Sequence, residues 1–184
     1  MMSRVPDLSD DDLSPEQRAV VAEAVAGLRG RMPAPMRAWL VSPELARRAQ
    51  HLGEFLRYQT SLEPRLSELA ILVTARFWTS HYEWYAHVDA ARAAGVSDEV
   101  IEAIRTGQDP DFTAPDEEVV YAVATAVHHD HVVSSDLFER ATSTLGEVGT
   151  AELVGLLGYY TLVAMTLNVY GIVPGEHVPN PFPA

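Results

Sequence analysis

The sequence predicts an all-α protein, and three observations support this fold class. Capping residues followed by proline recur, as at Ser14 with Pro15. This pair is typical of a helix start, because the side chain of the cap accepts a backbone N–H and proline has no backbone N–H that would stay unpaired. Glycine followed by a fresh cap, as at Gly95 with Ser97, ends one helix and begins another. No run alternates apolar and polar residues between turn signals, which is the pattern of a half-buried strand.

The same signals place the helices along the chain. The first helix is expected to end before Pro33 and Pro35, because proline breaks helical geometry. A pair of helices that ends at a glycine is expected after Pro64. The expected helices span about residues 14–30, 42–59, 64–95 (the pair), 97–105, 115–129, 135–145 and 150–170.

The length favours a single domain. Residues 1–184 suffice for one domain with a substantial core and are too few for two comfortable ones. We expect extended arms at about residues 1–13 and 174–184, the second of which is rich in proline. The first residues have no apolar stretch like that of a secretory signal, so we expect a cytoplasmic protein.

Composition excludes several classes of function. The formal net charge of −13 argues against nucleic acids as partners, because their phosphates would be repelled. All 13 basic residues are arginine, so Schiff-base chemistry and a P-loop lysine are both excluded. The chain has no cysteine and therefore no thiolate nucleophile and no cysteine-based zinc or iron–sulfur site.

The segment Leu153–Val173 contains no charged residue and is long enough to span a membrane. It also contains tyrosines, threonines, an asparagine and three glycines, and it has no basic flanks. A helix that is apolar on all sides is buried somewhere. We therefore expect no membrane span but a helix that is buried in the core or between subunits, and so a homo-oligomer.

Glu83 and His87 best fit a catalytic site. Their i, i+4 spacing places both side chains on one face of a helix. A continuous helix would extend this stripe to Arg76 and Ser80, and aromatic residues such as Trp84 border it. A carboxylate, an imidazole and a guanidinium among aromatics are the groups needed to bind a small organic acid and to transfer a proton.

A purely structural interpretation of the same residues stays open. Ser80 and Glu83 have the spacing of a capping box, in which Ser80 would begin a helix and Glu83 would only satisfy its backbone. From the residues alone, Glu83 is therefore either a site residue or a helix cap.

The tract His128-His129-Asp130-His131 is a weak candidate for a metal site. It falls at a predicted helix end, where imidazolium favours the helix dipole, and adjacent residues of a helix point apart. Glu83 and His87 would also need a third ligand to hold a metal. We expect no metal and no cofactor.

The segment from Glu68 to His87 resembles the signature of the AhpD-like / carboxymuconolactone decarboxylase family. Redox members of that family carry Cys-x-Tyr-Cys, a His four residues after the second Cys and a Glu fifteen residues before it. Here the same spacing reads Ser-His-Tyr-Glu at 80–83, with His87 and Glu68 in the matching places. Ser80 and Glu83 stand where the two cysteines would be, so the resemblance is to a cysteine-free member.

This resemblance implies an all-α, AhpD-like fold that assembles as a homo-trimer or hexamer. It also implies proton-relay roles for Glu68, Tyr82 and His87. Cysteine-dependent alkylhydroperoxidase activity is excluded, because reduction of a peroxide in this family requires a thiolate. The non-redox branch of the family remains.

In that branch the best-known reaction is the decarboxylation of 4-carboxymuconolactone. It needs no cofactor, because the unsaturated lactone itself accepts the electrons released with carbon dioxide. By analogy, His87 would donate a proton to the nascent carbanion, and Glu83 and Glu68 would set its charge state.

The predicted function is a cofactor-free lyase that acts on a small carboxylated lactone or a related organic acid. Arg76 would orient a carboxylate of the substrate, with Ser80 and Trp84 beside it. Isomerase chemistry on a similar acid is a close variant. The alternative from another class is a non-catalytic helical oligomer that binds a small ligand or a partner.

Overall fold

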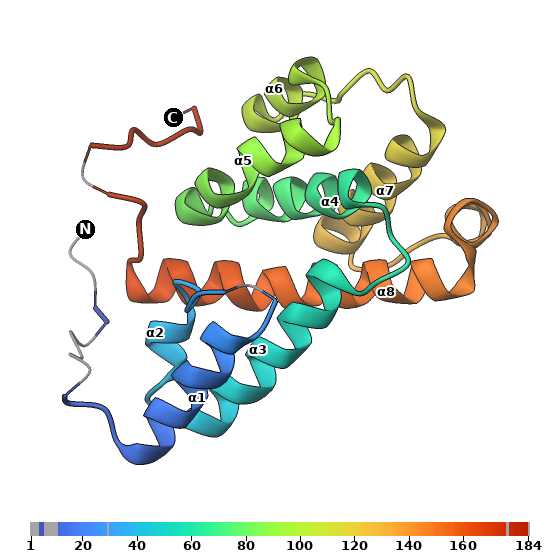
Figure 1. The fold of residues 1–184 in the computed structure, drawn as a ribbon. Coiled ribbons are helices and arrows are strands. Elements are labelled where there is room, and N and C mark those ends of the chain that lie inside the picture. The colour runs from blue at the N-terminus through green and yellow to red at the C-terminus, as the bar shows by residue number, and fades with distance from the viewer. Residues whose placement is uncertain (1–3, 6–10, 29, 176, 184) are drawn as a thin grey trace.

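The computed structural model of the protein is all-helical, as predicted, and describes residues 4–5, 11–28, 30–175 and 177–183. No strand occurs in these ranges. The helices, shown in Figure 1, are α1 (Pro15–Ala26), α2 (Met36–Trp39), α3 (Pro43–Tyr58), α4 (Pro64–Phe77), α5 (His81–Ala94), α6 (Asp98–Thr106), α7 (Pro115–Thr125), a π-helical turn (Ala126–Asp130) and α8 (Ser135–Tyr170).

The helix starts follow the capping rules. Ser14 and Gln17 form the predicted capping box of α1: the Gln17 N–H donates to the Ser14 hydroxyl at 3.2 Å, and the Ser14 N–H donates to the Gln17 amide oxygen at 2.8 Å. The Ser97 hydroxyl accepts the Val100 N–H at the start of α6. Proline opens α1, α3, α4 and α7. The local sequence therefore fixes where most helices begin.

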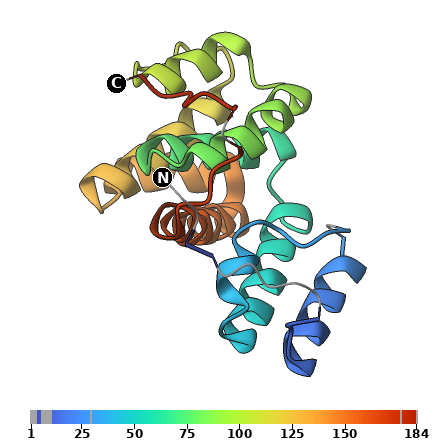
Figure 2. The same ribbon diagram turned by 90° about the vertical axis from the view of Figure 1, so that its left-hand side faces the viewer.

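Helix α4 is the most deeply buried element, since every residue from Leu66 to Ala75 is buried. It packs against α5, α7 and α8. Helix α8 crosses the whole molecule, with α1–α3 on one side and α4–α7 on the other (Figures 1 and 2). Gly53 lets α3 approach α8 closely, because a Cβ there would lie 2.1 Å from the Tyr159 hydroxyl.

Several boundaries differ from the sequence prediction. The first helix ends at Ala26, and the short helix α2 was not anticipated. The two helices expected at 135–145 and 150–170 form the single element α8, which kinks at Gly146 with φ 74° and ψ 170°. Glycine alone adopts that backbone readily. The end of the helix expected at 115–129 is a π-helical turn.

Described residues near both ends of the chain contact the helices. Of the predicted N-terminal arm, residues 1–3 and 6–10 lie outside the described residues, and the Arg4 N–H donates to the Tyr170 carbonyl at 2.8 Å. The predicted C-terminal arm contains no helix in its described residues. Phe182 in that arm is nevertheless buried.

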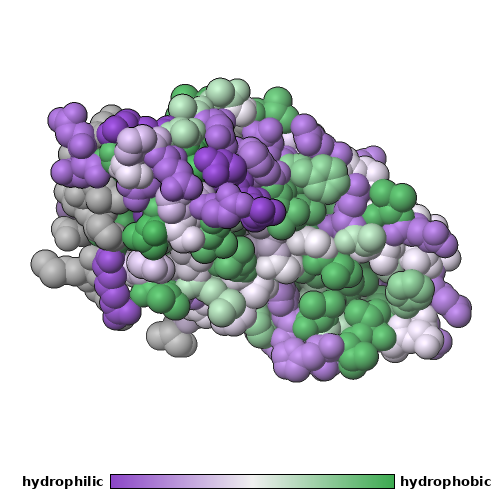
Figure 3. All heavy atoms as spheres, turned by 90° about the horizontal axis from the view of Figure 1, so that it is seen from below, coloured by the Kyte–Doolittle hydropathy of each residue, from purple (hydrophilic) through white to green (hydrophobic). Residues whose placement is uncertain are grey.

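Helix α8 has one buried and one exposed apolar side. By length and composition it is the one described helix that could cross a membrane, but half of its apolar window is buried in the protein. The exposed side carries Val154, Leu162, Met165 and Val169, and a Cβ at Gly158 would meet only open space. Apolar side chains are also exposed on α3, and Figure 3 shows apolar patches on the face seen from below.

We propose that a further copy of this chain covers the exposed side of α8. Contiguous apolar surface of this kind marks interfaces, and an uncharged face lets copies with a net charge of −13 approach each other. Light scattering at micromolar concentration is expected to show three or six chains, the number that the family resemblance supplies. Met165→Glu is expected to give monomers, because a charge would be buried in the interface.

Val132→Glu is the matched control for this prediction. Val132 is equally apolar and 68% exposed, but it lies in the loop before α8. Its substitution is expected to leave the mass unchanged. A monomeric wild-type protein would contradict the interface.

Candidate functional site

The junction between α4 and α5 is a sharp turn rather than a continuous helix. Thr79 adopts a left-handed backbone with φ 49°, and the Ser80 N–H donates to the Ala75 carbonyl at 2.8 Å. The turn is tied to α8, because the Asn168 amide donates to the Trp78 carbonyl at 2.7 Å. This hydrogen bond gives Asn168 a structural role within the subunit.

A buried hydrogen bond joins His87 of α5 to Glu68 of α4. The His87 Nδ1 atom lies 2.6 Å from the Glu68 Oε2 atom, and both side chains are at most 10% exposed. A carboxylate on Nδ1 fixes the orientation and the tautomer of the imidazole. The structure thus brings together two residues that the sequence places 19 positions apart.

Two further residues complete this cluster. The Arg57 guanidinium of α3 lies 3.4 Å from the second oxygen of Glu68, and the Tyr160 ring of α8 meets the His87 imidazole edge-on at 5.1 Å. Four helices therefore converge on His87 and Glu68. Arg57 and Tyr160 were not predicted as site residues, because no spacing rule links residues on separate helices.

Glu83 lies one helical turn before His87 on the same face of α5. Its side chain is 1% exposed, and neither carboxyl oxygen has a hydrogen-bond partner. Burial raises the pKa of Glu83 well above its ordinary value, because the charged carboxylate loses its solvation. The raised pKa favours the protonated acid.

The capping-box interpretation of Ser80 and Glu83 is wrong. Ser80 is the N-cap of α5, but its side chain makes no capping hydrogen bond. The Ser80 hydroxyl is fully buried and has no partner, like the Glu83 oxygens. Buried polar atoms without partners are rare and costly, and they commonly occur where a ligand supplies the missing bond.

Arg76 lies apart from the stripe in which a continuous helix would have placed it. The turn at Thr79 redirects the chain, and the Arg76 guanidinium stacks on the Phe182 ring at 5.4 Å. The Trp84 ring also meets Phe182, at 5.4 Å. Arg76 and Trp84 thus share a neighbour that no sequence pattern indicated.

Tyr82 is a half-buried aromatic that packs against the core. Among the described residues its hydroxyl makes no hydrogen bond, and no hydrogen bond or ring contact joins Tyr82 to His87 or Glu68. The relay role of Tyr82 stays a prediction.

The histidine tract holds one buried residue. His128 stacks on Phe77 at 4.7 Å, and its Nε2 atom lies 3.0 Å from the Thr74 hydroxyl. The Thr74 hydroxyl donates to the Ala70 carbonyl, so His128 is the donor in this pair. Burial, assisted by the nearby His129, lowers the pKa of His128 to about 4. No cluster of metal-binding side chains occurs among the described residues.

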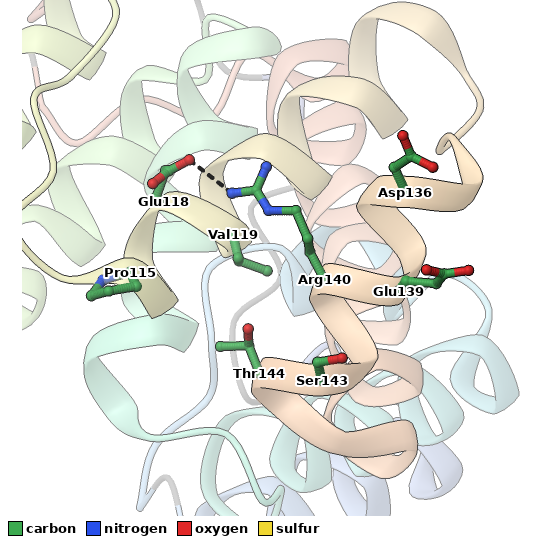
Figure 4. Close-up of a pocket in the computed structure, with 8 residues that line it drawn as sticks. All are labelled: Pro115, Glu118, Val119, Asp136, Glu139, Arg140, Ser143 and Thr144. Atoms are coloured by element: carbon green, nitrogen blue, oxygen red, sulfur yellow. Dashed lines mark hydrogen bonds and ion pairs between the residues drawn. The ribbon is translucent and has the colours of Figure 1, made fainter.

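A pocket of about 540 Å³ lies between α7 and the first part of α8 (Figure 4). The Glu118–Arg140 ion pair, at 2.8 Å, spans it. None of the predicted site residues lines this pocket; its walls are formed by Pro115, Glu118, Val119, Asp136, Glu139, Arg140, Ser143 and Thr144.

The fold and the buried cluster define a cysteine-free helical protein with acid/base groups between packed helices. Residues 43–126 match the family model described as carboxymuconolactone decarboxylase family. The matched segment runs from α3 to the start of the π-helical turn and contains Arg57, Glu68 and His87. No curated protein matches the chain.

Replacing Glu83 with Gln is expected to change how stability depends on pH. Because the folded-state pKa of Glu83 is raised, the wild type gains stability from the protonated acid at low pH and loses it as pH rises above the unfolded value of about 4.5. Urea unfolding at pH 5 and pH 8 is expected to show this loss in the wild type. Glu83→Gln should remove it, and an unchanged loss would contradict the buried acid.

Acid is expected to destabilise the protein through His128. Its folded-state pKa of about 4 lies below the unfolded value of 6.5, so the stabilisation is complete above pH 6.5 and is lost as pH falls toward 4. The loss should reach roughly 3 kcal/mol, since each pKa unit is worth about 1.4 kcal/mol. Urea unfolding of His128→Gln should show a smaller loss, whereas the exposed His131→Asn control should behave like the wild type.

Proposed function

We propose that the protein is a cofactor-free lyase of the decarboxylase type that acts on a small carboxylated lactone or a related organic acid. The observation that carries this proposal is the buried His87–Glu68 hydrogen bond of 2.6 Å, beside the buried and unpartnered acid of Glu83. The match of residues 43–126 to the carboxymuconolactone decarboxylase family supports decarboxylase-like chemistry.

In such a reaction the bond between a ring carbon and the carboxylate carbon breaks. Its electron pair stays on the ring carbon and spreads into the unsaturated carbonyl system, while carbon dioxide leaves. A proton donor then forms the new C–H bond, and the proton comes from water at the end of the cycle. The protein therefore needs a proton donor and a group that stabilises charge on the carbonyl oxygen.

His87 is the proposed proton donor. Glu68 holds one ring nitrogen, and Arg57 contacts the second oxygen of Glu68, so the carboxylate is pinned between two cations when His87 is protonated. The walls of this cluster include the Tyr160 ring, which excludes water and strengthens these interactions.

Glu83 and Ser80 are suited to donate hydrogen bonds to the carbonyl oxygen of the substrate. A protonated carboxyl and a hydroxyl can both donate hydrogen bonds, and neither donor is used inside the protein. A neutral acid in a dry site can stabilise a developing enolate without bringing a competing negative charge. This role differs from the charge-setting one that the sequence suggested for Glu83.

A non-catalytic ligand-binding oligomer is the second candidate function. It is favoured by the exposed apolar side of α8, which suits assembly whether or not a reaction takes place. The two candidates differ in whether carbon dioxide is released.

His87→Ala is expected to lower turnover of 4-carboxymuconolactone by about 10²–10⁴-fold, the usual contribution of a general acid. Carbon dioxide release and loss of the lactone absorbance measure it. Glu68→Gln should also reduce turnover, because the amide holds the imidazole less strongly. The exposed His131→Ala variant is the control and should keep wild-type activity.

Two results would count against the proposal. One is equal turnover by the wild type and a folded His87→Ala variant. The other is an absence of carbon dioxide from the wild type with any of a panel of carboxylated lactones and unsaturated acids, which would favour the non-catalytic oligomer.

A further inference from the structure

The C-terminal arm, defined as residues 177–183, folds back over the junction of α4 and α5. In Figures 1 and 2 it rises from the end of α8 toward α5 and α6. Phe182 is 7% exposed, and its ring centroid lies 5.4 Å from the Arg76 Cζ atom and 5.4 Å from the Trp84 ring centroid. One aromatic side chain of the arm thus fills a place that is lined by a cation and an aromatic ring.

Among the described residues, few polar contacts hold the arm in this place, and one of them joins His81 to the Pro179 backbone. The Arg105 guanidinium donates to the Pro181 carbonyl, and the Phe182 N–H donates to the Asn180 side chain at 3.1 Å, within the arm itself. The arm has no helix and no strand pairing in its described residues. Phe182 is therefore its main anchor, and local opening needs few contacts to break.

Arg76 lacks the partner that comparable arginines have. The other half-buried arginines of the described chain each pair with a carboxylate: they are Arg47, Arg57, Arg65 and Arg105. Arg76 pairs with no described carboxylate, and its Nε atom is buried without a hydrogen-bond partner. In a chain with 26 acidic residues, a half-buried guanidinium without an anion indicates that the anion comes from outside.

His81 lies beneath the same arm. Its imidazole interacts with the Pro179 backbone, while its Nε2 atom is buried without a partner. Burial lowers the pKa of His81 and the Pro179 contact raises it. The Nε atom of Arg76 and the Nε2 atom of His81 are thus both buried without a hydrogen-bond partner. The Arg76 N–H can donate to an anion directly, whereas His81 Nε2 donates only when the imidazole is protonated.

We propose that Arg76, His81 and Trp84 form a subsite for a planar, unsaturated or aromatic carboxylate, and that Phe182 occupies the place of the ligand's ring in the ligand-free protein. The guanidinium would bind the carboxylate through paired N–H groups, and the ligand ring would take the position of Phe182 against Trp84. The inference deepens the proposed function and rests on it for the choice of an organic acid as ligand.

The subsite adjoins the acid/base cluster. Trp84 follows Glu83 directly in α5, and successive helical residues are turned by about 100°. The subsite and the cluster therefore lie on neighbouring sides of one helical turn. A ligand with its carboxylate on Arg76 is held at the edge of the cluster that contains Glu83.

The arm would then set the affinity of the subsite. A ligand that needs the position of Phe182 binds only to the fraction of molecules in which the arm has moved. Removing the Phe182 ring makes that fraction close to one, so affinity rises by the factor that the closed arm had cost. Replacing Arg76 removes the anchor itself and lowers affinity in every arm position.

Benzoate is the probe for this inference, with calorimetry as the measurement. Phe182→Ala is expected to bind benzoate about tenfold more tightly than the wild type. Arg76→Gln in the same background should weaken binding at least about tenfold. Arg37→Gln, which removes an exposed arginine of equal charge, is the matched control and should leave the affinity unchanged.

A second measurement guards against a poorly folded Phe182→Ala protein. Hydrogen exchange of the arm amides in the wild type is expected to rise when benzoate is added, because the ligand displaces Phe182. The inference is overturned if folded Phe182→Ala fails to bind benzoate, if Arg76→Gln binds as well as its parent, or if exchange in the arm stays unchanged at saturating benzoate.

The His87→Ala variant separates this inference from the proposed function. It should bind benzoate like the wild type while it loses turnover. If His87→Ala loses turnover but Arg76→Gln does not weaken benzoate binding, the subsite is wrong and the lyase proposal stands. If Arg76→Gln weakens benzoate binding but His87→Ala keeps its turnover, the subsite stands and the lyase proposal is wrong.

Discussion

The hydrogen bond between His87 and Glu68 is the constraint around which the central helices are arranged. It joins α4 to α5 in a region where both partners are almost out of reach of water. A buried carboxylate needs a positive or hydrogen-bonding partner on each oxygen, and Arg57 of α3 lies near the second one. The ion pair between Arg57 and Glu68 therefore links α3, which packs on α8, to the buried cluster of α4 and α5.

Near the hydrogen-bonded pair of His87 and Glu68 lie polar groups that have no hydrogen-bond partner. Ser80, Glu83, Arg76 and His81 all have buried polar atoms without partners, and all belong to one short stretch at the junction of α4 and α5. Each buried polar atom without a partner lowers the free energy of unfolding, so a group of four such residues is costly to the fold. Functional sites are where proteins keep such local costs.

Helix α8 links the site to the surface of the molecule. Its buried side supplies Tyr160 to the cluster, and the exposed Asn168 donates its amide N–H to the turn after α4. Its exposed apolar side carries Val154 and Met165. A subunit packed on that exposed side would press on the helix that lines the cluster. The proposed assembly would therefore act on the geometry of the site through one helix.

The sequence by itself determined the helical class, the starts of most helices and the pairing of Glu83 with His87 on one face, because caps, prolines and the 3.6-residue period act over a few residues. The family spacing also indicated Glu68. Only the tertiary structure decided which acid binds His87, that Glu83 is neither a cap nor ion-paired, and that Arg76 turns toward Phe182. Those outcomes depend on packing between elements far apart in the chain and on the turn at Thr79, which no local pattern encodes.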